Sequence, residues 1–371
     1  MGEIRAFSEE HVPDVAGLYL RAMRGRPGPA GTALQDYFRE IFFTNPWVSP
    51  EIPPLVYFDR GSVVGFLGVI PRVMEFRGRI IRVATVSQFM VERKQYRGPA
   101  AIELLQRFFK GPQDLSCTDG AAEESHIVWR AAGGHGAHLY SFHWLRALRP
   151  AQTVRNFVDR TTGTLRLLAE ASLGAAAPVD ALLARLPGPF RVPRSTYISS
   201  PVSSEDLLRT IREVGWREPL KPSYEAPSFG WLMSQTAATR SRGDLCMTAV
   251  RAADGSLCGW HVYYAKRGGP ATVLQIGVRR RDQFDGVFAA LLRDAWEWGS
   301  SSVKGQAMPQ FLVNLTQQFC LFRQATTCVL FQSRNPDLTD TIFRGRAALT
   351  GLDGERWLDF PGACGDSGAR R

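Results

Sequence analysis

The stretch Val83–Phe109, VATVSQFMVERKQYRGPAAIELLQRFF, decides the fold because it passes from one kind of secondary structure to another across a short loop. β-Branched and aromatic residues in Val83–Val91 favour a strand, whereas Ala101–Phe109 carries its apolar residues at helical spacing. Between them, Gly98 permits close approach of a ligand to the backbone, and Pro99 suits the first position of a helix. Strand, glycine loop and helix N-terminus together form an anion cradle suited to a pyrophosphate.

This loop resembles the acyl-CoA signature of the GCN5-related N-acetyltransferase (GNAT) superfamily, Gln/Arg-x-x-Gly-x-Gly/Ala after the fourth strand. Gln95, Gly98 and Ala100 match it position for position. Pro99 has no N–H, so the loop has one donor fewer than the family's usual loop. The resemblance implies that acetyl-CoA or another acyl-CoA binds as cosubstrate. The residues expected to bind it are Met90, Val91, Gln95, Tyr96, Arg97, Gly98, Ala100 and Ala101.

The segments around the loop follow the order of elements in the same family. Leu55–Phe58 and Val63–Ile70 are predicted to form a hairpin, and a turn at Arg77-Gly78 leads into the strand before the loop. After the loop, Leu115–Cys117 is predicted to be a strand and Glu123–Ala132 a helix. We therefore expect an antiparallel meander that leads into the pyrophosphate loop.

The second half of the chain repeats this pattern. Met247–Val250 and Leu257–Tyr264 match the first hairpin, Val273–Val278 matches the strand before the loop, and Val287–Trp298 matches the helix after it. In the intervening loop, Asp285 places a negative charge where a phosphate would lie. We therefore expect the second copy not to bind CoA.

Although Gln283 and Gly286 keep two positions of the signature in the second loop, Phe288 replaces its small residue.

The predicted fold class is α/β (α+β), with two tandem GNAT-like domains, each a mixed, largely antiparallel twisted sheet flanked by helices. The predicted boundaries are an acyl-CoA-binding domain over residues 1–150, a helical, Pro-rich connector over 151–198 and a degenerate GNAT-like domain over 199–371.

Composition sets limits on the kind of protein. Of 371 residues, 44% are hydrophobic and 22% charged, an ordinary balance for a globular chain too long for one core. No uncharged apolar run reaches the roughly 18 residues of a transmembrane helix, and the N-terminus lacks the pattern of a signal peptide, so we expect a cytoplasmic protein. The six cysteines form no Cys-x-x-Cys pair and have no histidine at metal spacing, which predicts reduced thiols and no metal.

The formal net charge of +10 suggests an anionic partner, and CoA is itself one. Basic residues are scattered except at Arg279–Arg281, and aromatic residues do not alternate with them as a stacking surface for nucleic acid requires. The sequence therefore argues against nucleic acid, although a tRNA acceptor stem stays open as a partner. It does not indicate the oligomeric state.

Acyl transfer requires a bound donor, an acceptor that loses a proton and a thiolate that gains one. In the family a tyrosine commonly protonates the thiolate; here that place is Trp129, which cannot do so. Gln88 stands where many relatives have a carboxylate base. Cys117 offers an acyl-enzyme alternative. The catalytic candidates that remain are Glu123, His126 and Tyr140, with Glu124 and His143 as further options.

Tandem arrangements of this kind are similar to acyltransferases found among bacterial polysaccharide and cell-envelope genes, and more distantly to Fem-type aminoacyl transferases. The segments Gly351–Leu358 and Leu139–Trp144 resemble features of that group. The resemblance implies transfer of an acyl group to an amine on a small-molecule or saccharide acceptor, such as an amino sugar or an exopolysaccharide precursor. Two alternatives stay open: a non-catalytic CoA-binding sensor or scaffold, and a Fem-like transferase that uses aminoacyl-tRNA.

Overall fold

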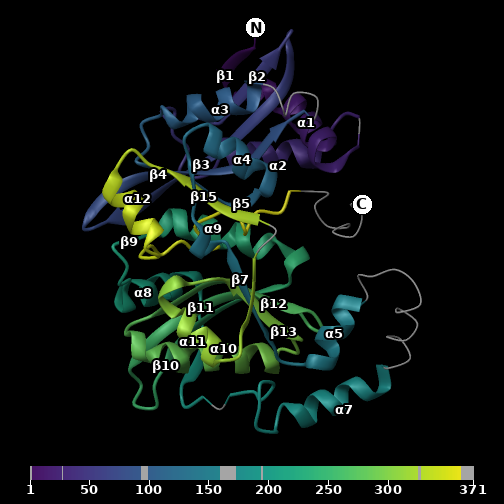
Figure 1. Cartoon of the computed structure of the whole chain (residues 1–371), viewed down its shortest axis with the longest axis vertical. Helices are drawn as coiled ribbons and strands as arrows, with labels where there is room; N and C mark the ends of the chain where they lie inside the picture. The colour runs from purple at the N-terminus through teal and green to yellow at the C-terminus, as the bar shows by residue number, and fades with distance from the viewer. Residues whose placement is uncertain are drawn as a thin grey trace. The chain divides into compact units, whose positions relative to one another are not determined.

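The chain forms two compact units in a computed structural model that describes residues 2–26, 28–92, 99–158, 173–193, 195–324 and 327–360 (Figure 1). Each unit draws on separate parts of the sequence. Unit 1 comprises Met1–Ser141, Glu218–Leu232 and Ala325–Cys364, and unit 2 comprises Phe142–Arg217, Met233–Gln324 and Gly365–Arg371.

Unit 1 is built on a mixed sheet in the strand order β1-β2-β3-β4-β5-β15-β6, with β9 paired to β3. The pairings are antiparallel except between β4 and β5, which run parallel. The strands are β1 Glu3–Ala6, β2 Leu55–Asp59, β3 Ser62–Phe76, β4 Arg79–Val91, β5 Leu115–Ala122, β6 His135–Gly136, β9 Leu220–Pro222 and β15 Thr327–Gln332.

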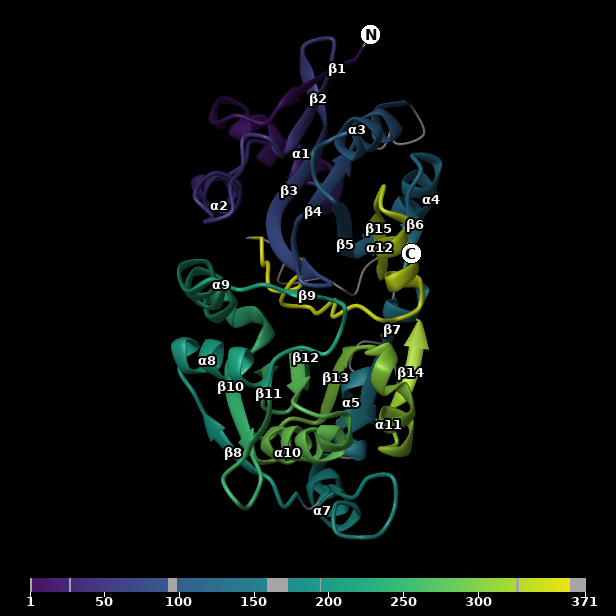
Figure 2. The same ribbon diagram turned by 90° about the vertical axis from the view of Figure 1, so that its left-hand side faces the viewer.

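Helices cover both faces of this sheet. Figure 2 shows α1 and α2 on one face, with α3 and α4 on the other. On the α3 side, Ala84 and Val86 of β4 pack with Ala101 and Leu104 of α3 in one apolar cluster. The helices are α1 Val12–Arg24, α2 Thr32–Phe43, α3 Pro99–Phe109, α4 Glu123–Ala131 and α12 Pro336–Phe343, and α9 Ala226–Ala238 begins in unit 1 and ends in unit 2.

Unit 2 has a mixed sheet in the order β14-β7-β13-β12-β11-β10-β8, in which only the pair β12–β13 is parallel among the described strands. The strands are β7 Phe142–Ala147, β8 Ile198–Pro201, β10 Asp244–Arg251, β11 Leu257–Ala265, β12 Pro270–Val278, β13 Ser302–Gln306 and β14 Leu321–Gln324. The helices are α5 Pro150–Val158, α7 Leu173–Leu183, α8 Ser204–Val214, α10 Phe284–Glu297 and α11 Leu312–Gln317.

The two sheets confirm the predicted duplication. β10, β11, β12, α10 and β13 follow the same order as β2, β3, β4, α3 and β5. A serine at the N-terminus of the first helical segment also recurs in both units. Ser8 has this position after β1, and Ser203 caps α8 after β8. Glycines recur too: a Cβ at Gly68 or Gly259 would lie 2.3 Å from a carbonyl oxygen of the neighbouring strand, so both positions require glycine.

The domain boundaries do not follow the sequence order. β7 leaves the first half of the chain and lies between β13 and β14, while β15 comes from the second half and lies between β5 and β6. Each sheet is therefore completed by a strand from the other half. The expected boundaries at 1–150, 151–198 and 199–371 do not coincide with the two units, because pairing between distant strands leaves no local mark in the sequence.

The predicted elements match the structure closely where they depend on local pattern. The hairpin, the strand before the loop and the helices after it all form, and the fold class is confirmed. α7 lies within the predicted connector and runs through Pro178. No helix among the described residues is both long and apolar enough to cross a bilayer.

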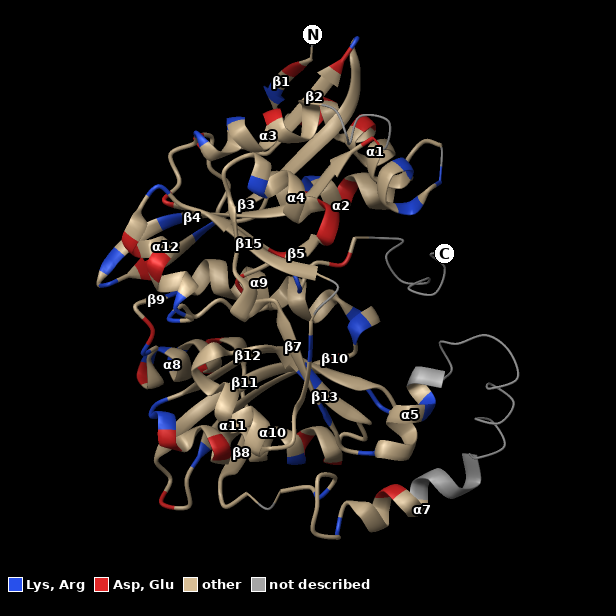
Figure 3. Ribbon diagram, viewed as in Figure 1, with Lys and Arg blue, Asp and Glu red and all other residues tan. Residues whose placement is uncertain are grey.

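Charged residues of both signs are interspersed along the same elements (Figure 3). Several of them form ion pairs with residues nearby in the sequence. At the C-terminal end of α12, for example, Arg344 Nε lies 2.8 Å from Asp340 Oδ1, and before α10 Arg280 pairs with Asp282 at 2.6 Å. Exposed pairs of this kind contribute little to stability, typically below about 1 kcal/mol each. Buried charges are therefore the better indication of a functional site.

Candidate active site

Strands β4 and β5 lie side by side over only three residues. Their parallel pairing joins Val83–Thr85 to Leu115–Cys117, after which β4 continues along β3 and β5 continues along β15. We call the diverging segments, Val86–Val91 and Thr118–Ala122, the fork. No described strand pairs with the inner edge of β4 along the fork. An extended ligand could therefore add itself there as a strand.

A β-bulge interrupts β4 within the fork. While β3 advances from Phe66 to Gly68, β4 passes from Met90 back to Ser87, so that β4 has one extra residue. Gln88 has a φ of +56° at this point, which is uncommon for a residue other than glycine. A bulge leaves the extra residue out of the ladder and re-aims the local backbone. The bulge therefore changes the direction of the backbone N–H and C=O groups of β4 near Gln88, beside the fork.

An acidic side chain from the segment 350–358, which follows α12, lies at the fork. The Thr118 hydroxyl donates to Glu355 Oε1 at 2.9 Å, and the Glu355 backbone N–H donates to Asp119 Oδ1 at 2.8 Å. A Cβ at Gly120 would lie 2.3 Å from Glu355 Oε1, so this carboxylate rests directly on the backbone of β5. The fork therefore contains a carboxylate.

The environment of Glu355 favours its neutral form. Burial and the neighbouring Asp119 carboxylate together raise its pKa to about 7, against the opposing effect of the Thr118 hydrogen bond. Asp119 itself is engaged by Arg356, whose Nε donates to Oδ2 at 3.0 Å. A carboxyl group that titrates near neutral pH is well placed to take up and release a proton.

A second partly buried carboxyl group, Asp353, lies in the same segment. The Tyr224 hydroxyl donates to Asp353 Oδ1 at 2.5 Å, and the Thr350 hydroxyl donates to the other oxygen. Burial raises the pKa of Asp353 to about 6, although these hydrogen bonds and the charge of Arg72 lower it. The Thr85 hydroxyl donates to the Asp353 carbonyl at 3.3 Å, which ties the segment to β4.

Arg72 of β3 places a buried cation beside these acids. Its guanidinium lies 3.8 Å from the ring centroid of Trp47 and 5.4 Å from that of Trp357. Nε and Nη2 of Arg72 have no hydrogen-bond partner among the described residues. Burial lowers the pKa of Arg72 to about 10, against the opposing charge of Asp353, so the group stays protonated at neutral pH. A buried cation with unused donors can receive an oxygen atom of a ligand.

The structure describes four of the eight predicted cofactor-binding residues. Met90 and Val91 end β4, and Ala100 and Ala101 are buried in the first turn of α3. The remaining four predicted residues, Gln95, Tyr96, Arg97 and Gly98, lie outside the described residues. The strand-to-helix framework is therefore confirmed, and binding of CoA by these residues stays a prediction.

Of the three predicted catalytic residues, Glu123 and His126 lie near each other on α4, and Tyr140 lies on a separate segment after β6. Glu123 is exposed at the start of α4, and His126, one turn later, lies against Gly136 and the ring of His138. Tyr140 is buried, and burial raises its pKa. Its hydroxyl donates to the Ala347 carbonyl at 2.9 Å and accepts from the Ala347 N–H at 2.8 Å. Tyr140 thus fixes the segment that precedes Glu355.

Two further side chains considered from the sequence have structural roles. Trp129 is buried, and its Nε1 donates to the Phe331 carbonyl of β15 at 3.0 Å. The Cys117 thiol lies at the end of the β4–β5 pairing, and burial raises its pKa to about 12. A thiol that stays protonated is a poor nucleophile, which disfavours an acyl-enzyme.

Sequence reasoning missed Arg72, Asp119, Asp353 and Glu355. Asp119 carried the clearest signal, because a carboxylate within a buried strand requires a compensating partner. Nothing local indicates that its partner is Glu355, which lies 236 positions further along the chain. The segment Gly351–Leu358 stood out only through its family resemblance.

The corresponding loop in unit 2 is closed by protein side chains. Gly286 lies in the first turn of α10, where a Cβ would meet the Tyr197 ring at 2.5 Å. The Ser195 hydroxyl donates to the Gly286 carbonyl, and Asn314 Nδ2 donates to the Asp285 carboxylate at 3.1 Å. Gly286 is therefore required for packing against Tyr197 rather than for approach of a phosphate.

Solved structures share this architecture. The chain is similar to a probable N-acyltransferase of unknown function from Enterococcus faecalis V583, with 12% identity, a TM-score of 0.56 and coverage of 90% of this chain and 73% of that chain. A GCN5-related N-acetyltransferase from Anabaena variabilis ATCC 29413 gives 12% identity, a TM-score of 0.57 and coverage of 91% and 74%. The fold is a tandem GNAT-like fold.

A third GNAT-like neighbour is Saccharomyces cerevisiae N-myristoyltransferase with bound myristoyl-CoA and inhibitors, at 11% identity, a TM-score of 0.51 and coverage of 89% of this chain and 79% of that chain. No protein-family model matches the sequence, and no curated protein matches it. At these identities the comparisons establish the GNAT-like fold alone. In the described part of the chain, no three His, Cys, Asp or Glu residues are grouped so as to hold a metal ion.

Proposed function

We propose that unit 1 transfers an acyl group from acyl-CoA to an amine by direct attack of the amine on the thioester. The observation that carries this proposal is the fork: β4 and β5 part after three residues, and a carboxyl group with a pKa of about 7 lies on β5 within the opening. An acyl-CoA donor is supported by the GNAT-like fold and by the neighbour that holds myristoyl-CoA.

The donor would lie along β4. Its pantetheine arm would pair with the unpaired inner edge of Val86–Val91, and its pyrophosphate would lie at the N-terminus of α3, where the backbone N–H groups and the helix dipole favour anions. The bulge at Gln88 would direct a backbone donor toward the thioester carbonyl. In this proposal Ala100 and Ala101 keep the helix close to the sheet because their side chains are small.

Glu355 is the proposed base. Its carboxylate would take a proton from the amine, the nitrogen lone pair would form a bond to the carbonyl carbon, and the C–S bond would break. The departing thiolate requires one proton, and the amine releases one through Glu355, so that the protons balance within the site. We assign no tyrosine to this transfer, because the hydroxyl of Tyr140 is engaged by Ala347.

An amino sugar or another amine of an envelope or exopolysaccharide precursor is the proposed acceptor class. The buried cation Arg72 favours an acceptor that carries an oxygen-rich or anionic group beside its amine. A second function, a CoA-binding sensor without catalysis, is favoured by one observation: Trp129 takes the place of the family's tyrosine and is hydrogen-bonded to Phe331.

Calorimetry with acetyl-CoA tests donor binding without knowledge of the acceptor. We expect the wild-type chain to bind and Gly98→Glu, which adds a carboxylate one position before α3, to abolish binding. Gly31→Glu is the matched control, because Gly31 also precedes a helix of unit 1 and nothing lies within 4 Å of a Cβ there. The donor site is wrong if both variants bind acetyl-CoA as the wild type does.

Turnover separates the enzyme from the sensor. Release of the CoA thiol from acetyl-CoA is followed with glucosamine and a panel of other primary amines as acceptors. Binding of acetyl-CoA together with amine-dependent thiol release supports the enzyme. Binding without release on any amine supports the sensor. The corresponding Gly286→Glu change in unit 2 is unsuitable as a control, because a side chain there would collide with Tyr197.

A further inference from the structure

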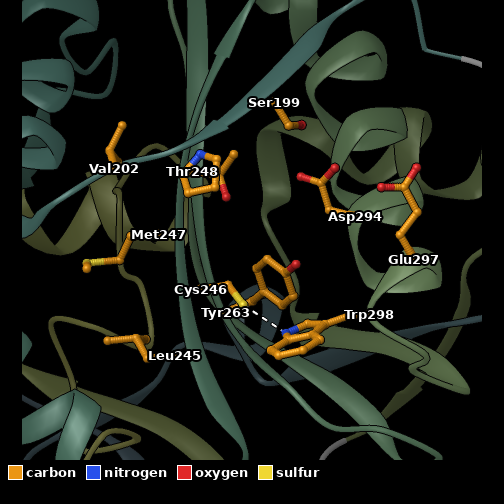
Figure 4. Close-up of a pocket in the computed structure, with 11 residues that line it drawn as sticks. Ser199, Val202, Leu245, Cys246, Met247, Thr248, Tyr263, Asp294, Glu297 and Trp298 are labelled. Carbon is orange, nitrogen blue, oxygen red and sulfur yellow. Dashed lines mark hydrogen bonds between the residues drawn. The ribbon is translucent and has the colours of Figure 1, made fainter.

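Unit 2 contains a cavity of about 500 Å³ that lies away from its degenerate loop. β8, β10, β11 and the C-terminal end of α10 surround it. Figure 4 shows Asp294 and Glu297 side by side on α10, with Tyr263, Cys246 and Trp298 next to them. A volume of this size is within the range of pockets that hold small organic ligands.

The charge of the cavity is of one sign. Asp294 and Glu297 are three positions apart on α10 and so lie on the same face of the helix. None of the eleven lining residues is Lys, Arg or His, although the whole chain has a formal net charge of +10. Arg293 approaches Glu297 from outside the lining, with Nε 3.7 Å from Oε1. Two carboxylates without a lining cation disfavour phosphate, carboxylate or CoA as the occupant.

A buried imidazole lies next to Asp294. His261 is fully buried, and its Nε2 lies 3.3 Å from Asp294 Oδ2. Neither ring nitrogen of His261 forms a hydrogen bond with any described residue. One carboxylate oxygen of Asp294 thus lies near a buried imidazole, while the side chain still lines the cavity.

An aromatic side chain, Trp298, follows Glu297 directly at the end of α10 and lines the cavity beside the two acids. Trp298 is 38% exposed, and its Nε1 donates to Cys246 Sγ at 3.0 Å. Burial raises the pKa of Cys246, and burial together with the charge of Asp294 raises the pKa of Tyr263, so the thiol and the phenol both stay protonated. Cys246 thus serves to fix the edge of the indole, which leaves an aromatic surface of fixed orientation for a ligand.

We propose that this cavity binds an organic amine in its cationic form, with the ammonium at Asp294 and Glu297 and the hydrocarbon against Trp298. The proposal goes beyond acyl transfer in unit 1 and does not depend on it. Carboxylates supply charge-assisted hydrogen bonds to N⁺–H, and the indole supplies apolar area and a π face for the cation. The charges of the lining select amines over alcohols or acids of the same shape.

Three probes of nearly equal shape test the charge requirement: phenethylamine, 2-phenylethanol and 3-phenylpropanoate. Each is titrated into the full chain by calorimetry and by quenching of tryptophan fluorescence. We expect phenethylamine to bind at least tenfold more tightly than 2-phenylethanol. 3-Phenylpropanoate should show no binding at concentrations up to roughly 10 mM, which corresponds to a very weak affinity. Equal affinity for the amine and the alcohol, or no binding of the amine, would overturn the proposal.

Variants locate the site. Asp294→Asn should weaken phenethylamine at least tenfold, and Glu297→Gln, an exposed position that folding does not need, should weaken it severalfold. Glu213→Gln is the matched control, because Glu213 is an exposed acid on α8 of the same unit, paired with Arg279 at 2.8 Å. If Glu297→Gln and Asp294→Asn bind like the control, the ligand lies elsewhere and the proposal fails. Binding of acetyl-CoA should be the same in all three, so failure here leaves the function of unit 1 untouched.

Discussion

Replacement of Glu355 by glutamine should lower turnover and raise stability at the same time. Glutamine keeps the shape of the side chain and an oxygen for the Thr118 hydroxyl, but it cannot accept a proton from the amine. Loss of a general base typically costs about 10²–10⁴-fold in rate. We expect that loss in thiol release from acetyl-CoA, with the dissociation constant of acetyl-CoA unchanged in calorimetry.

The pH dependence follows from the pKa of Glu355. In the wild-type protein the base is ionised only above about pH 7, so kcat/KM should fall as the pH drops below that value. In Glu355→Gln this acidic limb should disappear, and the small residual rate should be flat over the same interval. Glu103→Gln is the control, since Glu103 also accepts from a hydroxyl, that of Tyr57 at 2.9 Å, and it lies outside the fork.

The stability effect has the opposite sign. Because the folded pKa of Glu355 is about 7 and its ordinary value is 4.5, the folded state holds a proton that the unfolded chain has already lost between these pH values. Each unit of that difference is worth 1.36 kcal/mol, so the wild type loses at most about 3 kcal/mol of unfolding free energy as the pH rises through this window. Glu355→Gln avoids the loss.

Urea unfolding at pH 5 and pH 8 measures this difference. The variant should match the wild type near pH 5 and exceed it by up to about 3 kcal/mol at pH 8. A group retained at a cost in stability is expected at a functional site. If Glu355→Gln turns over at the wild-type rate with every amine that the wild type uses, Glu355 is not the base, whatever the stability result.

Three further results should distinguish structural from catalytic roles in unit 1. Trp129→Phe should lose about 1–3 kcal/mol of unfolding free energy in urea, because the Phe331 carbonyl loses the hydrogen bond from the indole N–H. Trp129→Tyr should raise turnover less than tenfold. Tyr140→Phe should lower stability by a similar amount through the buried backbone of Ala347, with calorimetric affinity for acetyl-CoA unchanged. Glu123→Ala and His126→Ala should keep turnover within about threefold of wild type; a loss of about a hundredfold in either would restore it as a catalytic residue.

The part of the fold that sequence predicts best is the part encoded locally. The strand, loop and helix of Val83–Phe109 and the two hairpins follow from side-chain period and turn residues within short windows. The duplication was visible for the same reason, because the second copy repeats these windows. The bulge at Gln88 was not visible, since its backbone geometry depends on the pairing with β3.

The candidate site was predicted only in part because most of its charges meet across long stretches of chain. Glu355 and Asp119 interact over 236 positions, and neither has a neighbour in sequence that points to the other. Gly286 fits the pyrophosphate signature by position, yet the Tyr197 ring is what requires glycine there. A motif indicates which residues are present, whereas burial and distant partners decide what they do.

The exchange of β7 and β15 between the sheets has a consequence for synthesis of the chain on the ribosome. The sheet that begins with Glu3 cannot be completed until Thr327–Gln332 has emerged, and Asp353 and Glu355 follow later still. N-terminal domains commonly fold first during translation, but here the first unit must wait with an open strand edge at β5. Products of truncated messages would therefore have an incomplete sheet and lack Glu355. We expect chaperones to bind such products through the exposed strand edge.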